Sequence, residues 1–247
     1  MSHNVSEKTK HKQKRALGAG RDYTSYVRSS ELPGHKSNTY VERDWKTGRA
    51  VHLLSGGEQK MYYILRFRDD VLDVREQFPL PLESTLEIVS KYKGFRHPRN
   101  RYGELVPYTT DFLVDLKNGQ QEAYSVKYSL EDLKKKENEN QVRNLYVQQE
   151  YWTSIGVAFR QVFTVDMNDA LFQNIYRVVS FYDPDTVCCT VDLFKHMVAR
   201  KLIRIDMESK VFTPKEFYSM AQKHLGEYDY TAVIEEIRKK YLEECSI

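Results

Sequence analysis

The stretch TTDFLVDLKNGQQEAYSVK, residues 109–127, decides how this chain folds. Residues 109–116, and residues 121–129 that extend just beyond this stretch, are rich in β-branched and aromatic residues, and the polar segment 117–120 separates them. This pattern predicts two strands that are joined in a hairpin.

The length of the hairpin loop decides which polar residues share a face, because successive side chains of a strand point to opposite sides. A two-residue turn at 118–119 would put Lys127 on the face opposite to Asp111. A three-residue loop at 117–119, with its glycine in the left-handed conformation, puts Asp111 opposite Ser125 and Lys127 on the same face. A site that acts on a phosphodiester would need the Asp111 carboxylate and the Lys127 ammonium on the same face of the hairpin. Such a site therefore predicts the three-residue loop.

A helix is predicted to begin at Ser55-Gly56-Gly57-Glu58. Serine followed three residues later by glutamate is a capping-box pattern, and Met61 and Leu65 recur at helical spacing. Glu58 lies in the first turn, on the side of the apolar neighbours Met61, Tyr62 and Leu65. We therefore expect its carboxylate to face inward.

Hydrolysis of a phosphodiester needs a hard divalent cation, oxygen ligands to hold it and a positive charge near the scissile group. Glu58, Asp111 and Lys127 are therefore the candidate catalytic residues. The alternative is that Glu58 only caps its helix, while Asp111 is an ordinary strand residue and Lys127 a surface lysine. The spacing alone is a weak motif.

Further segments show the periodicity of strands or helices and complete an α/β domain over residues 45–168. The predicted strands are residues 71–78, which end at a proline, and 155–165, and the predicted helices lie within 81–96 and 130–152.

The two ends of the chain have a different character. Residues 1–44 are poor in periodic apolar residues and carry five clustered cations, which predicts a mobile basic arm. Within 169–247, a helix at 190–201 is followed by two short apolar segments, 202–206 and 211–212, around a tight turn. A helix followed by such a β-wing predicts a winged-helix-like domain with a helical tail. The arm's cations are Lys8, Lys10, Lys12, Lys14 and Arg15.

The composition favours a soluble intracellular protein over a secreted or membrane protein. The 247 residues include 38 Lys and Arg against 35 Asp and Glu, a net charge of +3, so any DNA surface must come from local clustering. Three cysteines offer no disulfide framework. No apolar run approaches the roughly 20 residues that span a bilayer. We expect a cytoplasmic protein.

One segment interleaves cations with aromatic residues, a composition suited to phosphate contacts and base stacking. A solvated loop is the alternative. The cations that we assign to DNA binding are Lys91, Lys93, Arg96, Arg99 and Arg101. In the strand at 71–78, Arg75 and Glu76 are predicted to form a structural ion pair.

Several segments together resemble the TnsA family, the endonuclease subunits of heteromeric transposases. They are His52–Ser55, Val71–Leu80, Arg96–Pro98, Thr110–Asp115, Val126–Lys127 and Tyr151–Trp152. The decapeptide VLDVREQFPL at 71–80 is the most specific of these, and the similarity extends from about residue 17 to 165.

The resemblance implies a restriction-endonuclease-like catalytic domain that uses Mg²⁺, or Mn²⁺ in its place, to cut double-stranded DNA at the 5′ ends of a transposon. A TnsB-like transposase would cut and join the 3′ ends, and a TnsC-like ATPase regulator would contact the C-terminal part. Carried over to this chain, Glu58 and Asp111 would bind the metal with the Val126 carbonyl. Lys127 would hold the attacking water or stabilise the transition state.

The chain departs from the family at Ser125, because family members have glutamine two residues before the lysine. Serine is short and neutral, so we expect it to reach the metal through water or not at all. The alternative function is a catalytically weakened subunit that tethers DNA and the regulator. A free-standing nuclease such as a restriction enzyme is the third alternative.

Overall fold

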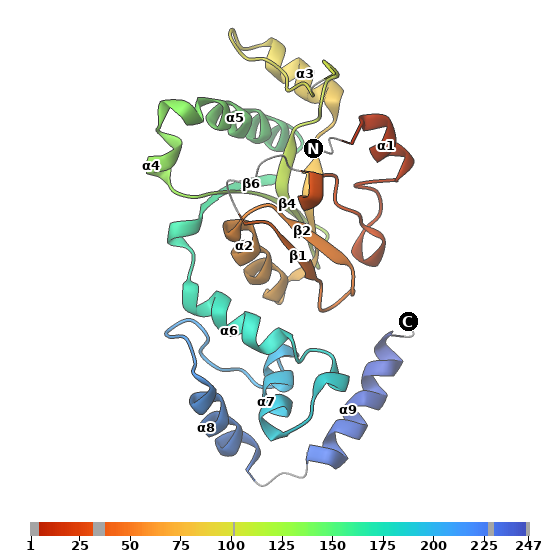
Figure 1. Cartoon of the computed structure of the whole chain (residues 1–247), viewed down its shortest axis with the longest axis vertical. Helices are drawn as coiled ribbons and strands as arrows, with labels where there is room; N and C mark the ends of the chain where they lie inside the picture. Colours follow the sequence, from red (N-terminus) through yellow and green to blue (C-terminus); the bar gives the residue numbers. More distant parts are fainter. Residues whose placement is uncertain (1–4, 32–37, 101, 227–229, 246–247) are drawn as a thin grey trace. The chain divides into compact units, whose positions relative to one another are not determined.

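The computed structural model describes residues 5–31, 38–100, 102–226 and 230–245. The chain divides into two compact units, Met1–Met167 and Asn168–Ile247. In Figure 1 the first unit carries the labels α1 to β6 and the second carries α6 to α9. The first unit combines helices with a mixed sheet, so the predicted α/β class is confirmed.

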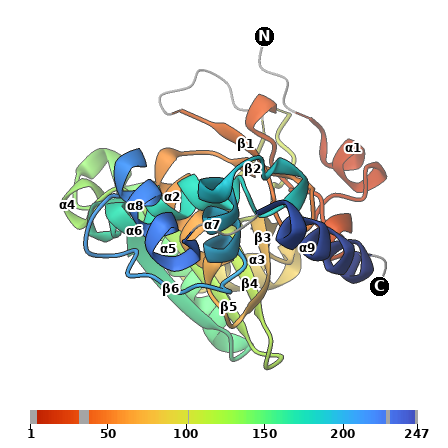
Figure 2. The same ribbon diagram turned by 90° about the horizontal axis from the view of Figure 1, so that it is seen from below.

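A four-stranded sheet in the order β3-β4-β5-β6 forms the centre of the first unit. In Figure 2 the labels β6, β5, β4 and β3 follow one another across it. Its strands are β3 (Val71–Pro79), β4 (Thr109–Leu116), β5 (Gln121–Lys127) and β6 (Ala158–Phe163). The first three pair antiparallel and β6 is parallel to β5. The four predicted strands are therefore confirmed.

Two further strands and several helices surround this sheet. Strands β1 (Tyr40–Arg43) and β2 (Ala50–Leu53) form a separate antiparallel pair. The helices are α1 (Glu7–Lys12), α2 (Gly56–Phe67), α3 (Leu82–Ser90), α4 (Leu130–Leu133) and α5 (Glu139–Ser154), with 3₁₀ turns η1 (Gly20–Asp22), η2 (Ser29–Glu31), η3 (Lys136–Asn138) and η4 (Thr164–Asp166).

The hairpin between β4 and β5 has the three-residue loop that the chemistry predicts. Leu113 lies opposite Ala123, and Gly119, the third loop residue, has a φ of 83°. This is the left-handed region that glycine enters without a steric penalty. The same register, continued toward the start of β4, puts Asp111 opposite Ser125.

Helices α2 and α5 cover opposite faces of the sheet (Figure 1). The ring of Phe112 on β4 lies 6.4 Å from that of Tyr62 on α2. The next residue, Leu113, belongs to an apolar cluster with Trp152 of α5. The hydroxyl of Thr110, two residues before Phe112, accepts from Trp152 Nε1 of α5 at 2.8 Å, so the regular alternation of side chains does not continue through Asp111.

The prediction of a mobile N-terminal arm is wrong for the described part of that segment. Tyr23 is buried, and its hydroxyl donates to the Glu76 carbonyl on β3 at 2.8 Å. Arg15 and Glu31 form a buried ion pair at 2.6 Å. Tyr23 thus attaches the segment to β3, and the ion pair joins two parts of the segment itself. A count of apolar residues misses such contacts.

Arg49 and Glu76 form a second buried ion pair, between the residue before β2 and the middle of β3. Two guanidinium nitrogens of Arg49 lie 3.0 and 2.7 Å from the two carboxylate oxygens of Glu76. The two side chains are 4% and 0% exposed. The His52 amide also donates to Glu76, at 3.2 Å. Burial raises the pKa of Glu76, and the Arg49 guanidinium opposes that rise.

The predicted pair between Arg75 and Glu76 is wrong. Arg75 donates instead to Asp115 on β4 at 2.7 Å. Neighbouring residues on a strand point to opposite faces, so the two side chains cannot meet.

The second unit consists of helices in its described residues, and the predicted β-wing is wrong. Residues 200–213 contain no strand. Asn174 donates to the carbonyls of Met207 and Lys210 and accepts from the Phe212 amide. Its side chain therefore occupies backbone groups that a pairing strand would need. The elements are α6 (Asp169–Val179), η5 (Pro184–Thr186), α7 (Thr190–Ala199), α8 (Pro214–Leu225) and α9 (Tyr230–Cys245).

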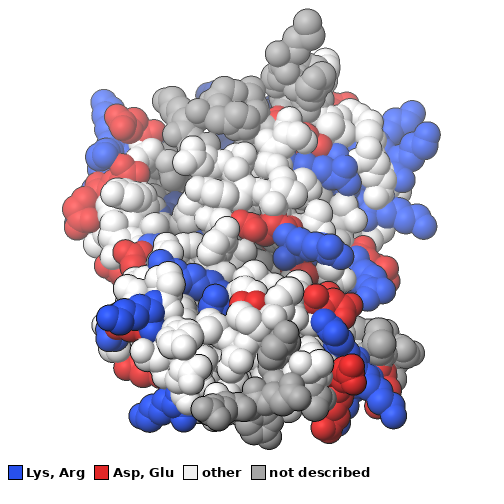
Figure 3. Space-filling view, turned by 60° about the horizontal axis from the view of Figure 1, so that its bottom comes forward, with Lys and Arg blue, Asp and Glu red and all other residues white. Residues whose placement is uncertain are grey.

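Side chains of both charges are mixed on one face of the molecule. Figure 3 shows Lys and Arg side chains interspersed with Asp and Glu over the face that it displays. This agrees with a net charge of only +3. Among the described residues, no helix has the length and apolar character needed to cross a bilayer.

Candidate active site

Asp111, Ser125 and Lys127 meet on the hairpin. The Ser125 hydroxyl donates to Asp111 Oδ2 at 3.0 Å and accepts from Lys127 Nζ at 3.1 Å. The Val126 amide donates to the same Asp111 oxygen at 2.6 Å. Lys127 Nζ lies 3.5 Å from Asp111 Oδ2. The serine, which the sequence marks as a departure from the family, therefore links the carboxylate to the ammonium.

Glu58 faces inward from the first turn of α2, as predicted. Ser55 caps this helix by accepting from the Glu58 amide at 3.1 Å. The Glu58 carboxylate, however, does not close a full capping box, because it accepts from the Leu54 amide at 2.9 Å and from Gln77 Nε2 at 3.0 Å. Burial, followed by the charge of the Asp111 carboxylate, raises the pKa of Glu58 to about 8.

Gln77 is a site residue that the sequence pattern missed. It lies on β3 between Glu76, paired with Phe112, and Phe78, paired with Thr110, so it stands across from Asp111. Its φ of 51° departs from extended geometry, and its side chain is buried against Glu58. Only the pairing of β3 with β4 could have found it.

The donor set suits a hard divalent cation. The Asp111 carboxylate is close enough for its negative charge to raise the pKa of Glu58. A divalent cation between the two carboxylates would offset this repulsion, as a proton on Glu58 does in its absence. Lys127 Nζ donates to the Val126 carbonyl at 2.9 Å, so this third oxygen also faces the centre. Within the described residues, no three His, Cys, Asp or Glu side chains gather around a metal position. The shell would therefore need further oxygen ligands from water or substrate.

Gly57 allows α2 to approach the hairpin closely. A Cβ on this residue would lie 2.2 Å from Thr164 Oγ1 and 3.2 Å from Val126 Cγ1. Thr164 is itself held, because its hydroxyl donates to the Lys127 carbonyl at 3.2 Å. The first turn of α2, which carries Glu58, therefore depends on this glycine.

We expect Gly57→Ala to lower the free energy of unfolding of the first unit by about 1–3 kcal/mol, since the added methyl overfills a packed contact. Both tryptophans of the chain, Trp45 and Trp152, belong to this unit. Tryptophan fluorescence during urea unfolding therefore measures it.

Thr164→Ala removes the oxygen that the new methyl would meet. The double variant Gly57→Ala/Thr164→Ala should be more stable than the sum of the two single changes predicts. Unchanged stability in Gly57→Ala would contradict the close approach.

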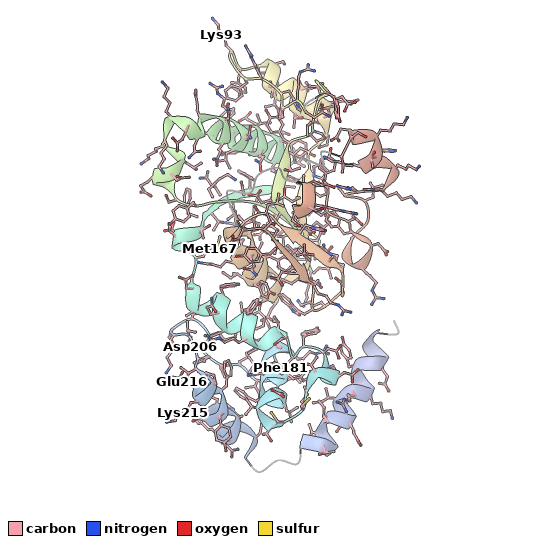
Figure 4. The ribbon with its side chains drawn as sticks, viewed as in Figure 1. Lys93, Met167, Phe181, Asp206, Lys215 and Glu216 are labelled. Carbon is pink, nitrogen blue, oxygen red and sulfur yellow. The ribbon has the colours of Figure 1, made fainter. Side chains whose placement is uncertain are left out.

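The candidate DNA-binding cations lie in the segment that follows α3. Lys93 extends away from the unit (Figure 4). Lys91 pairs with Glu87 at 2.8 Å, and Arg99 donates to the Gly103 carbonyl. Arg96 is exposed, and Arg101 lies outside the described residues.

The aromatic residues of this segment behave differently from the expectation. Tyr92 and Phe95 pack against Tyr146 of α5, with ring centroids 4.8 and 6.0 Å away. They therefore help to hold the segment on α5, while Tyr102 is 61% exposed.

Two comparisons with known proteins find relatives of this chain. The family model described as the TnsA-like endonuclease N-terminal domain matches residues 68–164, which include Asp111 and Lys127 but not Glu58. The transposition protein TnsA of transposon Tn7 from Escherichia coli is 31% identical over 166 residues. The match covers 66% of this chain and 58% of that relative, so the chain spans less than two thirds of the relative's length.

Proposed function

Because the chain belongs to the TnsA family, we propose that it is a Mg²⁺-dependent DNA endonuclease that cuts the 5′ ends of a transposon during cut-and-paste transposition. Its first unit would have the restriction-endonuclease-like fold of such nucleases. The proposal rests on one observation: hydrogen bonds join Asp111, Ser125 and Lys127. Glu58 is close enough for the Asp111 charge to raise its pKa.

Each side chain has a role in this proposal. Glu58, Asp111 and the Val126 carbonyl would hold the cation, and a bound Mg²⁺, or Mn²⁺, would polarise the scissile phosphate and acidify the attacking water. The Lys127 ammonium would orient that water or stabilise the negative charge that develops on the phosphate. Ser125 would keep Lys127 beside Asp111.

The DNA and protein partners follow from the family. Double-stranded DNA would lie along the segment that carries Lys91, Lys93, Arg96 and Arg99. A TnsB-like transposase would process the 3′ ends, and a TnsC-like ATPase regulator would bind the second unit. The name of the Escherichia coli relative supports transposition as the process.

The test is cleavage of a supercoiled plasmid that carries transposon ends, with the partner transposase and regulator present. We expect nicks at the 5′ ends in Mg²⁺, loss of these nicks in EDTA because the two carboxylates have no cation to hold, and recovery with excess Mg²⁺ or Mn²⁺. Mapping the labelled 5′ and 3′ ends separates the cuts of the two enzymes.

The outcomes distinguish the two functions. A tethering subunit would bind the plasmid and leave only the 3′ cuts, in every metal. Undiminished 5′ nicking in EDTA would contradict the metal-dependent centre.

A further inference from the structure

A cavity of about 610 Å³ lies in the first unit between the segment after α3 and helix α5. We call it the loop–helix cavity. Its walls include two aromatic residues, two arginines and two asparagines, and no carboxylate lines it among the described residues. The six are Phe95, Tyr108, Arg96, Arg143, Asn140 and Asn144.

The α5 wall of the cavity is polar on one helical face. Asn140, Arg143 and Asn144 stand at spacings of three and four residues, so they project from the same side of the helix. Arg143 keeps an ion pair with the exposed Glu139 at 2.6 Å, and its guanidinium also lies 5.8 Å from the Phe95 ring. Glu139 and Phe95 thus hold the Arg143 guanidinium at the cavity and leave it partly open to solvent.

The opposite wall is fixed to the sheet. The Tyr108 hydroxyl donates to the Arg96 carbonyl at 3.5 Å, and its ring lies 4.8 Å from that of His97. His97 in turn contacts the Thr85 hydroxyl at 3.0 Å. The segment after α3 is therefore anchored at the cavity.

The cavity is close to the candidate active site. Tyr108 stands three residues before Asp111, which is about 10 Å along an extended strand. Tyr108 also belongs to the same apolar cluster as Leu113, which stands two residues after Asp111. A DNA strand at Asp111 can therefore reach the cavity within a few nucleotides.

We propose that the loop–helix cavity binds an unpaired nucleotide of the substrate DNA, a proposal that rests on the endonuclease function. Phe95 and Tyr108 bound the space for the base, the carboxamides of Asn140 and Asn144 meet its hydrogen-bonding edge, and Arg96 and Arg143 neutralise the adjoining phosphate. The volume falls in the range of roughly 300–1,000 Å³ that encloses a ligand of nucleotide size. A phosphate group alone would leave most of it empty.

The test compares three labelled DNAs by fluorescence anisotropy with the full-length chain in EDTA, where no cutting occurs. One is a blunt duplex, one carries a short single-stranded tail, and one carries a tail of the same length whose sugars lack bases. We expect the normal tail to strengthen binding about tenfold, because stacking and edge contacts of one base are typically worth that much. The abasic tail, which keeps the phosphates, should give little gain.

Two variants assign this gain to the cavity. Asn140→Ala/Asn144→Ala changes only exposed side chains and should reduce the gain to about twofold or less, through loss of the hydrogen bonds to the base. The matched control Gln149→Ala, also exposed on α5, should leave the gain intact. Lys93 does not line the cavity and extends away from the unit (Figure 4). Lys93→Ala should therefore weaken binding of all three DNAs equally.

The results that overturn the proposal are distinct. Equal affinity for the normal and abasic tails would mean that the cavity holds phosphate only, and equal affinity for tailed and blunt duplexes would mean that it holds no part of the strand. The same loss in the asparagine double variant and in Gln149→Ala would remove the cavity from the explanation. If wild-type protein binds none of the DNAs, the DNA-contacting function itself fails.

Discussion

Asp111→Ala is expected to lower the rate of 5′-end cleavage by at least about 10²-fold, a typical cost for removing one stabilising group from a catalytic centre. Asp111 is the acceptor that holds the hairpin centre together, since one of its oxygens receives both the Ser125 hydroxyl and the Val126 amide. Its loss would remove one of the two carboxylates proposed to bind the metal, and Lys127 would lose the nearby negative charge. The measurement is the initial rate of nicking with Mg²⁺ and the partner proteins.

The matched control is Asp115→Ala, because Asp115 is a carboxylate on the same strand, about 13 Å further along. It pairs with Arg75 rather than with Lys127. We expect near wild-type cleavage for this control. Tryptophan fluorescence should show both variants folded, and equal cleavage by Asp111→Ala and wild type would remove Asp111 from the mechanism.

Arg49→Ala should lower the free energy of unfolding of the first unit by about 3–5 kcal/mol, because it leaves a buried carboxylate without its counter-ion. Glu76 is 0% exposed, and the guanidinium of Arg49 supplies two of its contacts. Urea unfolding followed by tryptophan fluorescence measures the change.

The pH dependence separates charge from packing. Without Arg49 the pKa of Glu76, already raised by burial, would rise further above its unfolded value. The folded state then holds a proton that the unfolded state releases, so the variant keeps its stability at acidic pH and loses it as pH rises through the folded pKa. A deficit that is equal at acidic and neutral pH would show that lost packing, not the unpaired charge, is the cause.

Two charge controls accompany this variant. Arg49→Met/Glu76→Gln removes both charges and should be more stable than Arg49→Ala. Lys91→Ala breaks an exposed pair with Glu87 in the same unit, and exposed pairs of this kind contribute little, so no measurable change is expected.

The hairpin and its polar residues could be predicted from sequence because they depend on local rules. The period of a strand and the need for glycine at the third loop position fix the register, and the register brings Asp111, Ser125 and Lys127 to one face. The capped start of α2 likewise predicts the inward Glu58. In each case the deciding residues are close together in the chain.

The parts that could not be predicted depend on long-range pairing. Gln77 meets Glu58 only because β3 pairs with β4 beside α2. The wing is missing because Asn174 binds the backbone more than 30 residues further along the chain. A strand-like composition at 202–212 contains no sign of that competitor.

The attachment of the N-terminal segment to β3 has a consequence for synthesis. Gly20 donates to Asp73 and Tyr23 donates to Glu76, and each donor precedes its acceptor by 53 residues. A ribosome releases the earlier segment first, so its donors have only water as a partner until β3 emerges. The contacts that attach this segment to β3 can therefore form only after β3 has been synthesised.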